Sequence, residues 1–402
     1  MIPLLASAQT DQRLRDRDPE LLGAKKVTGE LQEANFHNGP WYLLSRFRIA
    51  DAGYTQSSYV PTGDESGLSL SVEAPHRLYF VPHKKTIFSA EFTPGYSFFN
   101  QNKEQRQLNY LARADAHFLF NHLYLDVYTL KSDQLRAHVA DINRLATQVE
   151  NETGVAGEVK YSSRTSAIFS ARYRETEYPD DRFQPTRPNG DEIPVYLLER
   201  NERNARLSIN HKTFPLTSLF VASEVSNYGF KNATYMDSNR IYYGGGLSYD
   251  NGRTSFRVEG GPMKLDFDDP NQRDYDGILA RAEASRGNGR WNFSVGGDRD
   301  IGFSIFDDNS FYVATSAHTG VEYAATRRLT LRSGIIWERD RYETEVAGLK
   351  RMDEYSFSSV GFSYGIKRLR TGLDVGWYER ESTAFGDEDD GIRYVLHLSY
   401  TP

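Results

Sequence analysis

Apolar and polar residues alternate strictly in Leu68-Ser69-Leu70-Ser71-Val72-Glu73. Successive side chains of a β-strand point to opposite faces, so this pattern predicts a strand with one apolar and one polar face. The same alternation recurs in Phe88-Ser89-Ala90-Glu91-Phe92 and in Leu329-Thr330-Leu331-Arg332. Runs of this kind last about 9 to 15 residues, which is typical of tilted strands in a membrane barrel and long for a soluble protein.

The alternation extends from about residue 40 to the end of the sequence and gives about 18 strands. Strands of this number and length predict an all-β fold, a transmembrane antiparallel β-barrel of about 18 strands within a range of about 16 to 20. Because one face of each strand meets lipid and the other meets water, a mean hydropathy of −0.62 is compatible with 26 Tyr and 23 Phe. The strands are expected near residues 47, 72, 91, 114, 127, 154, 170, 206, 222, 244, 258, 281, 295, 317, 333, 360, 373 and 396.

The connections between these strands alternate between short and long, as in barrels with short periplasmic turns and long outer loops. In Asp250-Asn251-Gly252, the Asn-Gly pair predicts a type I′ hairpin, because both residues tolerate positive φ. Other short connections are expected at 121–122, 162–163, 214–215, 287–289, 326–327 and 367–368. Long loops are expected near 55–65, 132–146, 179–193, 231–237, 268–274, 341–352 and 381–390.

Two segments precede the barrel, which is expected over residues 40–402. Residues 1–8 end in Ala6-Ser7-Ala8, which resembles the cleavage site of a secretory signal, so we interpret them as the remnant of a signal peptide. Residues 9–39 are charged and weakly apolar, and we expect them to form a periplasmic N-terminal segment. The expected location is the outer membrane of a Gram-negative bacterium.

The composition excludes several classes of function. Cysteine is absent, which removes disulfides, thiol nucleophiles and thiolate metal sites. The net charge of −7 comes from 48 basic and 55 acidic residues that are intermixed, so no basic surface predicts binding to nucleic acid. No glycine-rich phosphate loop follows a strand and opens a helix, and no cofactor is expected.

If the apolar residues of each strand face lipid, the alternating residues line the interior, and many of them are charged. Charges on the lipid face are strongly disfavoured, so this distribution predicts a hydrated lumen. Barrels of 16 to 18 strands leave an aqueous channel, which favours a polar conduit over a self-neutralised wall around a closed lumen. The expected lumen-lining residues are Arg46, Arg48, Glu73, Glu91, Arg113, Asp115, Asp126, Glu158, Arg172, Arg174, Glu224, Arg257, Glu259, Arg281, Glu283, Asp298, Glu322, Arg332 and Asp374.

An outer-membrane lipid hydrolase is the least favoured alternative, because the nine histidines supply no evident Ser-His or His-carboxylate constellation. His318 and Glu322 share one face of an expected strand, but roughly 13 Å separates them, too far for a hydrogen bond. Acidic pairs such as Asp268-Asp269 are more typical of solvated loops than of a cation site. We therefore expect no enzyme, no catalytic residues and no metal.

Two segments carry a resemblance to outer-membrane β-barrel porins associated with exopolysaccharide export in Gram-negative bacteria. The run Ser45-Arg46-Phe47-Arg48-Ile49-Ala50-Asp51-Ala52-Gly53-Tyr54 is similar to an early strand of that family, and Phe214-Pro215-Leu216-Thr217-Ser218-Leu219 to a periplasmic turn and its following strand. The strand 394–400 resembles the aromatic-ended signal that the outer-membrane insertion machinery reads, although Thr401-Pro402 follow it. The resemblance implies passage of polysaccharide without cofactor or catalytic residues. It also implies contact with outer-membrane lipid, the insertion machinery, polysaccharide and periplasmic export partners.

The sequence therefore favours an outer-membrane transport barrel that forms a polar conduit for polysaccharide export. Two alternatives stay open. One is a general diffusion porin for small hydrophilic solutes, which an outer loop folded into the lumen from 132–146 or 179–193 would favour. The other is a closed structural or adhesive barrel whose acidic loops bind partners.

Overall fold

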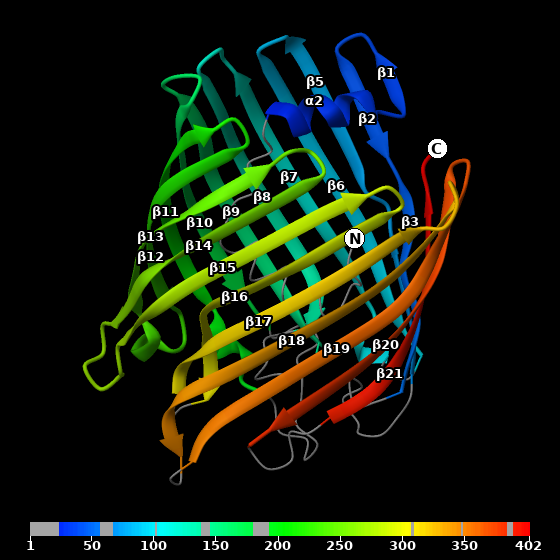
Figure 1. Cartoon of the computed structure of the whole chain (residues 1–402). Coiled ribbons are helices and arrows are strands. Elements are labelled where there is room, and N and C mark those ends of the chain that lie inside the picture. The colour runs from blue at the N-terminus through cyan, green and yellow to red at the C-terminus, as the bar shows by residue number, and fades with distance from the viewer. Residues whose placement is uncertain are drawn as a thin grey trace.

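The computed structural model describes residues 24–56, 67–100, 103–137, 145–179, 193–306, 309–346, 349–383 and 389–402. These residues form one antiparallel sheet that closes into a barrel (Figure 1). The helices of this part of the chain are α2 (Ala24–Gln32) and the 3-10 helices η1 (Lys103–Gln105), η2 (Val195–Leu198) and η3 (Thr234–Met236). None of these described helices is long and apolar enough to cross a membrane.

The strands follow one another around the barrel in the order of the sequence. They are β1 (Phe36–Asn38), β2 (Trp41–Ser45), β3 (Phe47–Gln56), β4 (Gly67–Glu73), β5 (His76–His83), β6 (Thr86–Phe99), β7 (Gln107–Leu119), β8 (Leu123–Ala137), β9 (Leu145–Lys160), β10 (Thr165–Glu177), β11 (Arg200–Phe214), β12 (Thr217–Phe230), β13 (Ser238–Asp250), β14 (Thr254–Phe267), β15 (Tyr275–Asn288), β16 (Trp291–Phe306), β17 (Asn309–Ala324), β18 (Leu329–Val346), β19 (Leu349–Ile366), β20 (Leu369–Ser382) and β21 (Asp389–Tyr400).

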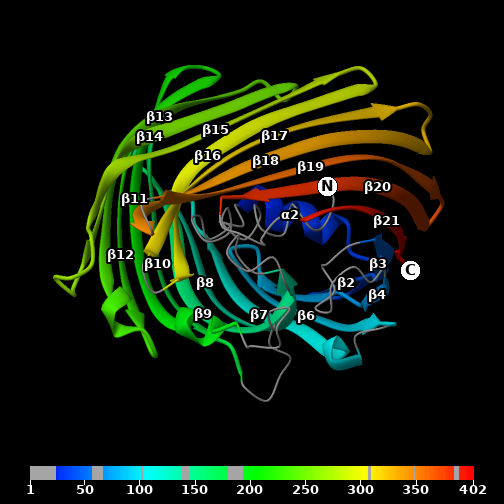
Figure 2. The ribbon, with the colours of Figure 1, turned by 90° about the horizontal axis from the view of Figure 1, so that it is seen from below.

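The closed wall contains 18 strands, which confirms the predicted fold and strand number. The described residues contain 21 strands, of which β1 pairs only with β2 and lies outside the ring. In the ring, β2 and β3 together form one interrupted wall strand, and β4 and β5 form another. The second interruption falls at Pro75, which has no N–H to donate, and its carbonyl accepts a hydrogen bond from the N–H of Arg46 at 2.9 Å. β21 pairs with β3, so the ring has no free edge (Figure 2).

The outer face of the barrel is apolar and the inner face is largely polar. Leu68, Val221 and Val258 are 55%, 60% and 46% exposed, whereas Glu224 and Glu259, on the opposite face of the same wall, are 2% and 6% exposed. A closed barrel with such an exterior requires lipid around it, and the chain is an outer-membrane protein.

Aromatic pairs lie on the outer face near the short turns. The rings of Trp41 and Phe80 are 4.4 Å apart between centroids, and so are those of Trp291 and Tyr323. Aromatic girdles of this kind mark the membrane–water interface in outer-membrane barrels. The short-turn end therefore lies at one surface of the membrane.

Short connections join the strands at one end of the barrel, where the sequence predicted them. The turn at Asn251-Gly252 is not the predicted type I′ turn, because Gly252 has a φ of +78° but Asn251 is not among the residues with positive φ. Instead the Asn251 side chain accepts hydrogen bonds from the N–H groups of Arg253 and Thr254 at 2.9 and 2.7 Å. An Asx turn thus takes the place of the expected left-handed pair.

The opposite end holds the longer connections, and two of the predicted loops are shorter than expected. Residues 341–352 are mostly strand, because β18 continues to Val346 and β19 begins at Leu349. Similarly, β8 continues to Ala137 and β9 begins at Leu145. The predicted loops at 55–65, 179–193 and 381–390 fall mainly outside the described residues.

The wall turns where β13 and β14 run side by side (Figure 2). Both strands are rich in glycine at this point, with Gly244-Gly245-Gly246 on β13 and Gly260-Gly261 on β14. A Cβ added at Gly261 would lie 2.1 Å from the carbonyl oxygen of Tyr243, so the two backbones approach closely only because no side chain is present. Across this turn of the wall, Arg206 of β11 forms an ion pair with Glu259 of β14.

Candidate functional site: the lumen wall

Arginine and glutamate side chains form an ion-pair network on the inner face of β11 to β14. Arg206 contacts Glu224 at 3.0 Å and also pairs with Glu259, across the two strands that lie between them. Arg240 pairs with Glu224 in turn. These four side chains are between 2% and 11% exposed, so each charge depends on its partner for compensation.

A second group extends this network along β9 to β11. Arg172 contacts Glu202 at 2.9 Å, and Arg174 contacts Glu152 at 2.7 Å. Arg174 also lies 4.0 Å from Glu202, so the arginines and glutamates form a continuous chain of opposite charges. Removing one member would leave a buried charge without its partner.

The charges on β14 and β15 face each other in the antiparallel register of these strands. Arg257 lies opposite Glu283, and Glu259 lies opposite Arg281. The ion pairs nevertheless run along each strand, from Arg257 to Glu259 at 3.2 Å and from Arg281 to Glu283 at 2.9 Å. The side chains of Arg257 and Glu283 are 44% and 45% exposed, so both are accessible to a solute in the lumen.

A charged group lies near the seam at which β21 pairs with β3 and closes the barrel. The carboxylate of Asp374 accepts a hydrogen bond from Nε of Arg332 at 2.7 Å, and Nδ1 of His397 lies 3.3 Å from the same carboxylate. Arg48 and Glu73 pair across β3 and β4. The seam itself is crossed by the ion pair of Arg393 on β21 with Asp51 on β3, in addition to the backbone ladder.

The other predicted lumen residues occupy separate positions around the wall. Arg77 pairs with Glu91, Arg113 contacts Asp115 at 2.7 Å, and Asp126 lies 3.1 Å from His117. Arg46 contacts Glu33 at 3.3 Å, and Glu158 lies 3.9 Å from Lys160. Asp298 accepts a hydrogen bond from Ser316. Glu322 on β17 lies opposite Arg332 on β18. The predicted residues therefore form several local groups and not one shared constriction.

Helix α2 lies against the inside of the wall near the short-turn end (Figures 1 and 2). Val27 is fully buried against Tyr79 of β5 and Ile87 of β6. One turn further, Glu30 accepts a hydrogen bond from Arg77 at 2.8 Å and pairs with the Tyr79 hydroxyl. Helix α2, which belongs to the predicted N-terminal segment, therefore lies inside the barrel at the mouth of the lumen.

An apolar cluster fills part of the interior toward the long-loop end. It includes Val195 and Leu198 of η2 and Met236 of η3, which are at most 1% exposed. These residues pack with inward-facing aromatic and aliphatic side chains of the wall, including Tyr228, Phe230, Tyr242, Met263, Leu265, Phe267, Tyr275, Leu279, Ile305, Phe311 and Val313. The lumen is therefore lined by charge in its middle part and narrowed by apolar packing on one side.

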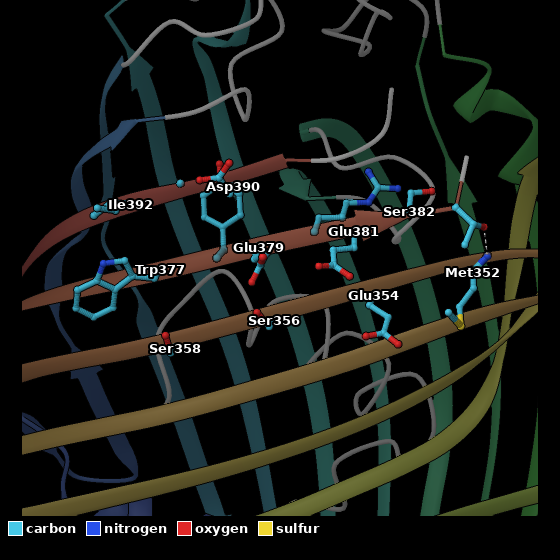
Figure 3. A pocket seen from close by; sticks show the side chains of 14 residues that line it. Met352, Glu354, Ser356, Ser358, Trp377, Glu379, Glu381, Ser382, Asp390 and Ile392 are labelled. Carbon is cyan, nitrogen blue, oxygen red and sulfur yellow. Dashed lines mark hydrogen bonds between the residues drawn. The ribbon is translucent and has the colours of Figure 1, made fainter. Parts of the chain in front are cut away.

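A hollow of about 1080 Å³ lies over β19 to β21 (Figure 3). Trp377 lines it and is 42% exposed, which places the hollow on the outward-facing side of the wall. Its acidic members include Glu354, Glu379 and Glu381. Glu354 accepts a hydrogen bond from Nε of Arg339 at 2.6 Å. Because it faces outward, this hollow is not part of the lumen.

The barrel has the fold of solved outer-membrane porins. OpdK of Pseudomonas aeruginosa, solved with vanillate, is 12% identical, with a TM-score of 0.53 over 90% of this chain and 98% of OpdK. OccK2 (OpdF) of the same organism, in complex with glucuronate, is 11% identical, with a TM-score of 0.51 over 89% and 98% of the two chains. OccAB1 of Acinetobacter baumannii is 11% identical, with a TM-score of 0.51 over 92% and 99%.

At these identities the likeness establishes the fold and not the solute. No family model matches the chain, and neither does any curated protein sequence. The expected association with exopolysaccharide export is not supported by these comparisons. The resemblance to porins holds for the architecture alone.

Several residues of the lumen network were not among the predicted ones. Glu202 and Arg206 lie in Arg200-Asn201-Glu202-Arg203-Asn204-Ala205-Arg206, where charged residues occupy both faces of the strand, so alternation does not distinguish inside from outside. Arg240 precedes a glycine-rich run that lacks an apolar face. A search for glutamates and arginines spaced by two or four residues would have found Glu202 and Arg206.

Proposed function

We propose that the chain is an outer-membrane diffusion porin for small hydrophilic solutes. The observation that carries this proposal is the inner wall of paired, partly accessible charges within a closed barrel of 18 strands. Barrels of this size leave an aqueous channel, and charges of both signs keep its wall hydrated. The small carboxylates bound to two of the similar structures, vanillate and glucuronate, support a small solute more than a polymer.

A closed structural barrel is the second candidate, because α2 and the apolar cluster around η2 and η3 both occupy interior space. In the porin proposal they narrow the path and set an upper size for the solute. The two candidates differ in one measurable property, since a narrowed channel conducts ions and a closed barrel does not.

The double variant Glu259→Gln with Glu283→Gln should shift the ion preference of the channel toward anions. Both carboxylates face the lumen near arginines, so their removal leaves net positive charge beside the path of the ions. The measurement is the reversal potential of single channels in a planar bilayer under a potassium chloride gradient.

The matched control is Glu379→Gln with Glu381→Gln, which removes two carboxylates from the outward-facing hollow. We expect its reversal potential to equal that of the unmodified chain. Two outcomes would contradict the proposal and favour the closed barrel. One is an unchanged reversal potential in the Glu259 and Glu283 variant, and the other is a complete absence of conducting steps.

A further inference from the structure

We propose that Asp115, His117 and Asp126 bind one divalent transition-metal ion, zinc(II) by ligand chemistry, in the wall of the barrel. Asp115 and His117 are two residues apart on β7 and so point to the same face, and Asp126 lies directly opposite His117 on β8. One ligand atom from each side chain lies within 4.8 Å of the other two. Imidazole nitrogen and carboxylate oxygen are ligands that zinc accepts.

Burial and charge make a further cation favourable at this cluster. The side chains of Asp115 and His117 are fully buried, and that of Asp126 is 1% exposed. Arg113 is the arginine beside them, with Nε 2.7 Å from Asp115 and Nη2 4.0 Å from Asp126. One guanidinium does not balance two buried carboxylates, and an uncompensated buried charge is strongly destabilising. A divalent cation bound by the three side chains would supply the missing charge.

The position of one oxygen favours the metal. Oδ1 of Asp126 is buried and accepts no hydrogen bond from the described residues, although it lies 3.1 Å from Nδ1 of His117. A buried acceptor without a donor calls for a further partner, and a bound ion is one such partner. Two ligands of a tetrahedral zinc ion with bonds of about 2.0 to 2.1 Å lie about 3.3 Å apart without any hydrogen bond between them, close to the separation of these two atoms.

Neighbouring side chains already hold the proposed ligands in place. Oγ of Ser89, on β6, donates a hydrogen bond to Oδ2 of Asp115 at 2.9 Å and lies 3.3 Å from Nε2 of His117. The Tyr124 hydroxyl lies 3.3 Å from Nδ1 of His117. Such contacts fix the orientation of metal ligands and contribute to metal affinity. A bound ion would therefore link β7 and β8 within a polar cluster that also includes β6.

The test uses the complete chain folded in detergent, stripped with EDTA and then titrated with zinc(II) alone. Bound zinc is counted by atomic emission, and affinity is measured by calorimetry. Folding is checked separately on gels, by the difference in mobility between unheated and heated samples. We expect one zinc ion per chain, and an affinity weakened about tenfold or more by His117→Gln and by Asp126→Asn.

His397→Gln is the matched control, because His397 also lies beside an aspartate and an arginine of the wall, Asp374 and Arg332, but belongs to no described three-ligand group. We expect this variant to retain the zinc. An unmodified chain that takes up no zinc would overturn the proposal, and so would a folded Asp126→Asn variant that binds zinc as tightly as the unmodified chain. Either result would leave the three side chains as a polar cluster of the wall without a metal.

Discussion

Replacing Val295 by arginine should prevent most of the chain from assembling into the barrel. Val295 lies on the outer face of β16 and is 55% exposed, between Phe293 and the glycine at 297. In a membrane this exposed side chain meets lipid, and an arginine there costs about 2 to 4 kcal/mol near the bilayer midplane. The fraction of chain that resists unfolding by detergent when it is not heated measures the effect.

The matched control is His318→Arg on β17. His318 lies opposite Gly296, the residue that follows Val295, so the new arginine has nearly the same height in the barrel but points to the inner face. Since that face is hydrated in the proposed porin, we expect near-normal assembly. Equal loss of assembly in both variants would show that the two faces of the wall do not differ as described.

Replacing Val27 by aspartate should raise the conductance of the channel by displacing α2 from the wall. Burial of a valine side chain contributes about 1.5 to 3 kcal/mol, and a carboxylate in its place would have to be buried without a partner between Tyr79 and Ile87. The helix should then leave the mouth of the lumen. Single-channel recordings would show larger steps or longer open times than those of the unmodified chain.

Gly29→Ala is the control within the same helix, because a Cβ added at Gly29 would have no atom within 4 Å. Alanine also favours helix over glycine by about 1 kcal/mol, so α2 should stay in place and the conductance should not rise. If Val27→Asp conducts as the unmodified chain does, α2 is not an obstacle to ions, and its place in the mouth has no bearing on transport.

The strands of the barrel could be predicted because a period of two needs no knowledge of the partner strand. Even in β4, which is only seven residues long, Leu68, Leu70 and Val72 distinguish the apolar face from the polar face. The outer end of β18 was missed for a physical reason. Residues 341–346 were expected in a loop because the outward positions beyond Trp337, among them Arg341 and Glu343, are charged and offer no apolar face.

The contacts inside the lumen could be predicted less well than the faces. Alternation placed Glu259 on the inner face, but its ion pair with Arg206 joins β14 to β11 across two other strands, and the curvature that brings them together is defined only by the folded wall. Helix α2 left a weak signal, since Val27 and Leu31 are four residues apart in a charged segment. That spacing predicts an apolar stripe but not the surface that receives it.

Passage of solutes of different size into proteoliposomes tests the central claim most directly. Vesicles containing the unmodified chain or the Val27→Asp variant are placed in isosmotic glucuronate or in a dextran polymer, and swelling is followed by light scattering. A diffusion porin predicts swelling in glucuronate, faster for Val27→Asp, and none in dextran. If neither chain admits glucuronate, or if dextran enters as readily, the barrel is not a conduit for small solutes.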